Sequence, residues 1–124
     1  GNTAAMIDSF VGAGRQNRAE GLESAVVAGY GNTAVGRDSF VGGGYENIAV
    51  GIDSFVGAGQ GNNAKGEGSG IVAGYNNVAT GKASVIIGGN SNTASGDVDS
   101  VIIGGESNTA SGDYSIAMGI KADA

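Results

Sequence analysis

Residues 32–46 read Asn-Thr-Ala-Val-Gly-Arg-Asp-Ser-Phe-Val-Gly-Gly-Gly-Tyr-Glu, and this segment is one copy of a fifteen-residue unit that fills the chain. The unit has the form N-x-A-x-G-x-x-S, followed by a short apolar run that ends in Gly. A fixed period of this kind predicts a stack of small units, none of which can bury its own apolar face alone. The Asn column consists of Asn2, Asn17, Asn32, Asn47, Asn62, Asn77, Asn92 and, after sixteen residues, Asn108.

The composition excludes several classes of function. Of the 124 residues 26 are Gly, and Pro, Cys, His and Trp are absent. Without Cys and His the chain lacks the commonest zinc ligands, a Cys or His nucleophile and a His general base. The net charge of −6 disfavours nucleic acid and anionic membrane as partners. We therefore expect no enzyme activity, no metal or cofactor, no nucleic-acid partner and no membrane insertion by this segment.

The period also predicts the architecture. Each unit holds two short apolar segments separated by Gly, and a Gly about every fifth residue argues against helix. We expect an all-β fold, a parallel β-solenoid of fifteen-residue coils, with residues 1–124 as one repetitive domain. Eight coils at the spacing of parallel strands make a rod of about 38 Å. Because the chain begins within a unit, without a signal peptide, stalk or membrane anchor, we expect it to be a fragment of a longer passenger.

Side-chain alternation predicts which residues of the first strand face inward. The two x positions of N-x-A-x-G are mostly polar, so they should face water. The Asn, Ala and Gly positions should therefore face the interior, where stacked Asn side chains can hydrogen-bond along the column. The polar x positions are Thr3, Arg18, Thr33, Asn63, Thr93, Glu20, Lys65, Ser95 and Ser111.

The second strand is apolar on both faces. At the first and third positions after Ser, Phe is always followed by Gly, as in Phe10/Gly12, Phe40/Gly42 and Phe55/Gly57. Such matched volumes suggest a shared confined space, so we assign these pairs to the coil interior. The second position then forms the contact between identical chains, although alternation alone also allows the reverse assignment. The expected contact residues are Val11, Val26, Val41, Val56, Ile71, Ile86 and Ile102.

The repeat resembles the YadA-like head of the trimeric autotransporter adhesins. Ser115-Ile116-Ala117-Met118-Gly119, followed by Ala122-Asp123-Ala124, is similar to the fourteen-residue form of that family's head repeat. The other units are a fifteen-residue version, with one more residue between Ser and Gly. The resemblance implies a left-handed parallel β-roll that assembles as a homotrimer. It also implies cell adhesion and virulence, with display on the outer membrane at the bacterial cell surface.

Two columns are candidate binding sites. Asp8, Glu23, Asp38 and Asp53 precede successive Ser residues. Stacked carboxylates can bind cations or basic partner surfaces, or they can simply occupy a solvated corner where Asp bonds the turn backbone. Tyr30, Tyr45 and Tyr75 share another position of the unit. Tyr is favoured at interfaces, but it also packs over corners.

Three hypotheses for function follow. The first is a bacterial surface adhesin head that attaches to host cells or extracellular matrix through a trimeric rod. The second is a structural spacer within an adhesin, and the third is a segment of a phage tail fibre or spike. The repeat has two irregularities: an extra residue in Asp97-Val98-Asp99, where we expect a bulged corner, and a shift of the pattern at Gly119.

Overall fold

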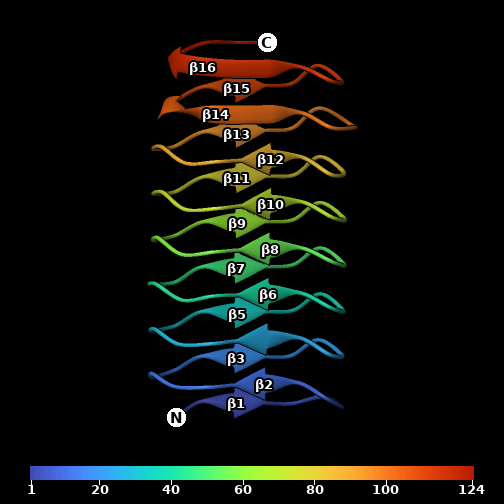
Figure 1. Ribbon diagram of the computed structural model, residues 1–124, viewed down its shortest axis with the longest axis vertical. Helices are drawn as coiled ribbons and strands as arrows, with labels where there is room; N and C mark the ends of the chain where they lie inside the picture. Colours follow the sequence, from blue (N-terminus) through green and yellow to red (C-terminus); the bar gives the residue numbers. More distant parts are fainter.

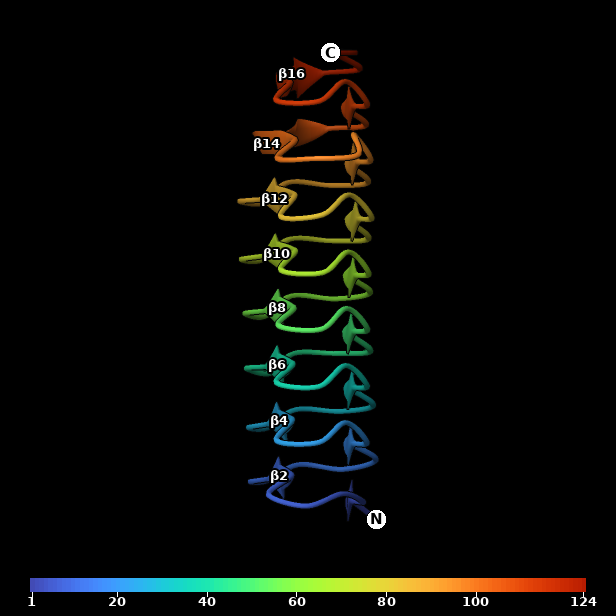
Figure 2. The same ribbon diagram turned by 90° about the vertical axis from the view of Figure 1, so that its right-hand side faces the viewer.

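Each unit folds into one coil with two short strands, and the coils stack into a rod with the termini at opposite ends (Figure 1). The computed structural model describes residues 1–124. It contains no helix, and thus no helix long and apolar enough to cross a membrane. The strands form two eight-stranded parallel sheets along opposite sides of the stack (Figure 2). The predicted all-β parallel solenoid of about eight fifteen-residue coils is confirmed.

The two sheets divide the strands by parity. The odd-strand sheet carries the N-x-A segments and consists of β1 (Thr3–Ala4), β3 (Arg18–Ala19), β5 (Thr33–Ala34), β7 (Ile48–Ala49), β9 (Asn63–Ala64), β11 (Val78–Ala79), β13 (Thr93–Ala94) and β15 (Thr109–Ala110). The even-strand sheet carries the apolar runs and consists of β2 (Phe10–Val11), β4 (Ala25–Val26), β6 (Phe40–Val41), β8 (Phe55–Val56), β10 (Gly70–Ile71), β12 (Val85–Ile86), β14 (Val101–Glu106) and β16 (Ile116–Ile120).

The register equals the period of the sequence. In the odd-strand sheet Thr33 lies beside Ile48, and Ala34 beside Ala49. The ladder hydrogen bonds continue beyond the strands, as in the 2.9 Å bond from the amide of Phe40 to the carbonyl of Ser54. Equivalent residues of successive units therefore form straight columns along the rod.

The interior is one narrow apolar seam between the two sheets. It joins the Ala column of the odd-strand sheet to the second-position Val/Ile column of the even-strand sheet. Ala34, Val41, Ala49 and Ile86 have no exposed surface. Each coil therefore buries about one Ala and one branched aliphatic side chain, and the stack makes these into a continuous core.

The predicted face assignment of the even-strand sheet is wrong. The expected chain contacts lie inside the coil: Val26, Val41, Val56, Ile71, Ile86 and Ile102 are fully buried, and Val11 on the first coil is half-buried. The Phe/Gly pairs, by contrast, lie on the outer face. The physical reason is size. The closed interior holds Val or Ile in seven coils and Ala117 in the last, whereas positions that vary from Gly to Phe need the free space outside.

The buried Asn column links every coil to the next. The backbone amide of Asn32 donates to Oδ1 of Asn17 at 3.0 Å, and Nδ2 of Asn32 donates to the same oxygen at 3.2 Å. Nδ2 of Asn32 also donates to the carbonyls of Ala28 and Gly44, at 3.1 and 2.9 Å. The prediction of inward Asn side chains that bond along the column is confirmed, and the side chain also satisfies the backbone of the turn that precedes it.

Two Gly columns are required by close backbone approach. A Cβ added at Gly36 would overlap the carbonyl group of Gly51 in the next coil. At Gly44 the backbone has a φ of 92°, which L side chains rarely adopt, and a Cβ would also overlap the carbonyl oxygen of Gly59. The corner between the sheets is tied by Ser39, whose Oγ donates to the carbonyl of Gly36 at 2.6 Å.

The extra residue near position 97 and the shift of the pattern at Gly119 each change the strand pairing only locally. The extra residue near position 97 places Val98 beside Lys82, while Asp99 keeps the left-handed φ of the corner at 52°. Pairing then resumes between Val85 and Val101. Between β14 and β16 the register shifts after Ile102, because the last unit is one residue shorter there. The expected bulged corner and the late shift of the pattern are both confirmed.

Replacing Asn47 with Ala should strongly destabilise the stack. It would leave the buried backbone amide of Asn62 without its acceptor and the carbonyls of Gly43 and Gly59 without a side-chain donor. At about 1–3 kcal/mol for each buried group that is left unsatisfied, the free energy of unfolding should fall by about 2–5 kcal/mol. Chemical denaturation followed by circular dichroism measures this. Asn90→Ala, at an exposed position, is the control and should change stability by less than about 0.5 kcal/mol.

Candidate functional site

The outer face of the even-strand sheet carries a continuous apolar stripe. It is made by the first and third positions after each Ser, which point away from the interior. Val27, Val72, Ile87 and Ile103 each expose between 42% and 48% of their surface. The first column of the stripe is Phe10, Ala25, Phe40, Phe55, Gly70, Val85, Val101 and Ile116, and the second is Gly12, Val27, Gly42, Gly57, Val72, Ile87, Ile103 and Met118.

The Phe side chains fill the space above the Gly residues of the stripe. A Cβ added at Gly42 would lie 3.4 Å from Cε1 of Phe40, so each Phe ring lies over the Gly two residues later. The rings of Phe40 and Phe55 also stack on each other, with centroids 5.6 Å apart and planes inclined by 5°. The matched volumes noted in the sequence thus fill a shared space, but that space is on the surface and not in the coil interior.

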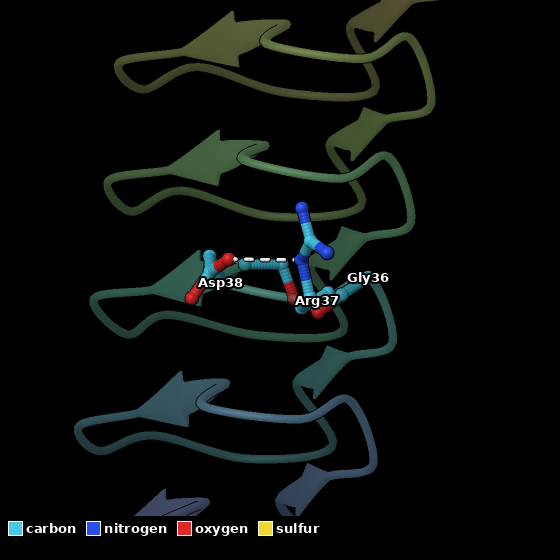
Figure 3. Close-up of polar contacts among 4 residues, drawn as sticks. Gly36, Arg37 and Asp38 are labelled. Carbon is cyan, nitrogen blue, oxygen red and sulfur yellow. Dashed lines mark hydrogen bonds and ion pairs between the residues drawn. The ribbon is translucent and has the colours of Figure 1, made fainter.

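The acidic column occupies the corner between the sheets. Asp8, Glu23, Asp38 and Asp53 are exposed and adopt φ values between 55° and 57°. None of these four side chains accepts a hydrogen bond from the turn backbone; Asp38 instead pairs with Nε of Arg37 at 3.1 Å (Figure 3). The shared feature of these four residues is therefore a left-handed backbone conformation at a solvent-exposed corner. No group of three or more acidic side chains is arranged to hold a metal ion.

The three candidate Tyr residues form one column at the opposite corner. Tyr30 and Tyr45 stack with ring centroids 5.3 Å apart and planes inclined by 7°. Gln60 separates Tyr45 from Tyr75 in the ladder of bridges. The negative charge of neighbouring Glu46 raises the pKa of Tyr45 above its ordinary value. The stacking of Tyr30 and Tyr45 covers one face of each ring, whereas Tyr75 stacks on neither of them.

A fourth surface feature was not predicted from the sequence. The outward positions of the odd-strand sheet are mostly polar, as predicted, yet Val35, Ile48 and Val50 in the third and fourth coils and Val78 in the sixth are apolar. Those of the third and fourth coils lie near Ile52 in the adjoining corner and form an apolar cluster with it. Val35, Ile48, Val50 and Ile52 form this cluster, which we call the apolar island. The sequence contains the signal for this cluster, because Val35 and Val50 are adjacent apolar residues in an otherwise mostly polar column. Assigning the column by its average polarity overlooks them.

The surface holds no pocket. The structure therefore offers flat or convex surfaces, of which the apolar stripe is the longest. No known family model matches the chain, and no curated protein matches it. The four surface features are therefore the candidates for contact with a partner.

Phe40 and Gly42 should be energetically coupled. Gly42→Val should cost about 1–3 kcal/mol by overpacking. Phe40→Ala should cost about 1–2 kcal/mol, because the ring is only half-buried. The double variant should be more stable than the sum predicts by about 0.5 kcal/mol or more, since removing the ring frees the space for Val. It should not regain full stability, because the Cβ at position 42 still meets the carbonyl oxygen of Gly57. Strictly additive changes in thermal or denaturant melts would contradict a shared space.

Proposed function

We propose that this chain is the head segment of a bacterial surface adhesin, a left-handed β-roll that assembles as a homotrimer and attaches to host cells or matrix. The observation that carries the proposal is the apolar stripe. Soluble monomers rarely leave long contiguous apolar patches uncovered. A second copy of the chain is the occupant that fits, because it has the same coil spacing and can cover all eight coils.

The composition of the stripe supports assembly between copies. No charged residue occurs in either of its columns. In the coils with Phe, the ring lies over the Gly two residues later, which evens the face there and lets it lie against a neighbour. Three copies of the chain around one axis would bury all three stripes at once. Three is the number of copies that the resemblance to YadA-like heads implies.

The mode of action follows from the shape. A rod without a pocket binds through its outer surfaces, and three parallel copies present each surface three times. When individual contacts are weak, such repetition raises overall attachment by about 10²–10⁴ if the receptor sites are suitably spaced. The proposed setting is an exposed passenger segment on the bacterial outer membrane.

Assembly is tested by Ile87→Asp. Ile87 is exposed in the single chain and lies at the centre of the stripe's C-terminal half. If three stripes meet, each carboxylate enters a dry contact at a cost of several kcal/mol. Sedimentation equilibrium should show a trimer for the native chain and monomers for the variant, with the β-sheet circular dichroism retained. Ser95→Asp, on the opposite sheet, should remain trimeric. A native chain that is monomeric at micromolar concentration would refute the proposal.

Ile86→Asp tests whether the column of Ile86 belongs to the coil interior and not to the contact between chains. Ile86 is fully buried inside its coil, so this variant should lose its folded structure altogether, and not merely dissociate.

Adhesion itself is tested by direct binding. The native fragment should bind cultured cells or immobilised matrix proteins saturably, and the Ile87→Asp monomer should bind much more weakly because it loses multivalency. A trimer that binds neither cells nor matrix would favour the spacer hypothesis.

A further inference from the structure

The apolar island lies on the face of the rod away from the stripe. Val35, Val50 and Ile52 expose 41–42% of their surface, and Ile48 is half-buried. Thr33 pairs with Ile48 between neighbouring strands, so Val35 and Val50, two residues further along, lie on adjacent coils. Neighbouring coils are about 4.8 Å apart, so these side chains form one contiguous cluster. The odd- and even-strand sheets occupy opposite sides of the stack, so the island stays exposed when the stripe is covered (Figure 2).

The fold does not require apolar residues at these positions. The column that contains Val35 and Val50 carries Glu20, Lys65 and Thr80 in neighbouring coils, with the same backbone pairing. A β-branched shape suits an extended strand, but Thr80 provides that shape with a polar group. Ile52 lies in the corner, where the adjacent coils place Arg37 and Glu67. Val35 and Val50 are therefore apolar exceptions in a mostly polar column. The other two columns also hold apolar residues elsewhere, Val78 in that of Ile48 and Ile7 and Leu22 in that of Ile52, but only the fourth coil is apolar in all three columns.

The island has a charged rim with three ion pairs, while the exposed Asp53, directly after Ile52, takes part in none. On this rim Glu20 pairs with Arg18, Asp38 with Arg37 at 3.1 Å, and Glu67 with Lys82 at 3.1 Å. Figure 3 shows the Arg37–Asp38 pair; Arg37 occupies the corner position that Ile52 holds one coil later. Lys65 follows Val50 by one coil in the same column and takes part in no ion pair. In a chain of net charge −6, an uncompensated cation thus stands directly beside an exposed apolar cluster.

We infer that the apolar island is a docking surface for a partner protein that presents two or three apolar side chains next to a carboxylate. The apolar groups would cover Val35, Val50 and Ile52, and the carboxylate would pair with Lys65. Burial of the surrounding apolar groups strengthens such a pair by excluding water. The inference rests on the proposed function, because it names the chemistry of the receptor contact. A second copy of this chain is a poorer occupant, since the island covers two coils and does not repeat along the rod.

Val50→Asp is the central test, with Ser95→Asp as its matched control. Both place a carboxylate in the same column at the same point of the coil, three coils apart. Glu20 already occupies this column, so the Asp variants should fold, which thermal melting checks. The probe is a displayed library of random linear peptides, selected on the assembled native protein. We expect enriched peptides with apolar residues beside Asp or Glu, and a loss of about tenfold or more in their affinity for Val50→Asp but not for Ser95→Asp.

Lys65→Gln tests the charged part of the contact. It should weaken the same peptides several-fold and remove most of the salt dependence of their binding. Peptides that bind Val50→Asp as tightly as the native protein would overturn the inference, as would selected peptides without the apolar–acidic pattern or a selection that enriches none. Sedimentation that shows the native assembly to be larger than the Val50→Asp assembly would also overturn it, by assigning the island to contacts between copies.

The outcome is separable from that of the proposed function. If the native protein binds cells or matrix and Val50→Asp binds them equally well, the adhesin proposal stands and the island is not the contact. If the native protein binds neither, the adhesin proposal fails, while the peptide measurements still decide whether the island docks a partner.

Discussion

The side chain of the buried Asn column is the interaction on which the rest of the stack depends. In each coil Asn Nδ2 donates to two carbonyls around the corner, as Asn47 does to Gly43 and Gly59, and Oδ1 accepts the backbone amide of the next Asn. A strand of two residues cannot satisfy the backbone polar groups of the long corners on either side of it. The ladder between coils pairs most of these corner groups, and the Asn side chain supplies partners for groups that it leaves out, such as the carbonyl of Gly43 and the amide of Asn62. The fifteen-residue period is therefore a hydrogen-bonding requirement as well as a packing pattern.

The narrowness of the coil explains why so much apolar surface lies outside. Between the two sheets there is room for an Ala such as Ala49 and one aliphatic side chain such as Val56, both fully buried. The even strands are apolar on both faces, so every residue of the outward face is left on the surface. A solenoid of this cross-section cannot close a core large enough to use the apolar content of its sequence. That geometry supports the proposed association through the outward face more directly than any single residue does.

Much of this architecture was predictable from the period, and the main error has a physical origin. The inward Asn, Ala and Gly positions follow from alternation in a strand with one polar side. The even strands have no polar side, so alternation offers two equal solutions. The side-chain volumes distinguish the two solutions. Val41, Val56 and Ile71 are nearly uniform in volume, as a closed interior demands. Phe55 and Gly70, by contrast, are neighbours in the same outward column although their volumes differ greatly. The match of Phe40 with Gly42 predicts that the two residues share a confined space in the interior. A Phe ring can equally fill the gap above a Gly on the outer surface of a sheet, and the match alone does not distinguish the two cases.

The two apolar surfaces differ in a way that fits the separate roles proposed for them, assembly for the stripe and recognition for the island. The stripe follows the repeat through all eight coils and contains no charge, which suits a partner with the same period. The island breaks the repeat in two coils and lies beside Lys65, which suits a partner that contacts one place and contributes a carboxylate. In a repeat protein the regular positions are constrained by every neighbouring coil, so local exceptions are the residues free to encode specificity. The exceptions on the solvent side of the rod, more than its regular columns, are therefore where recognition should be sought.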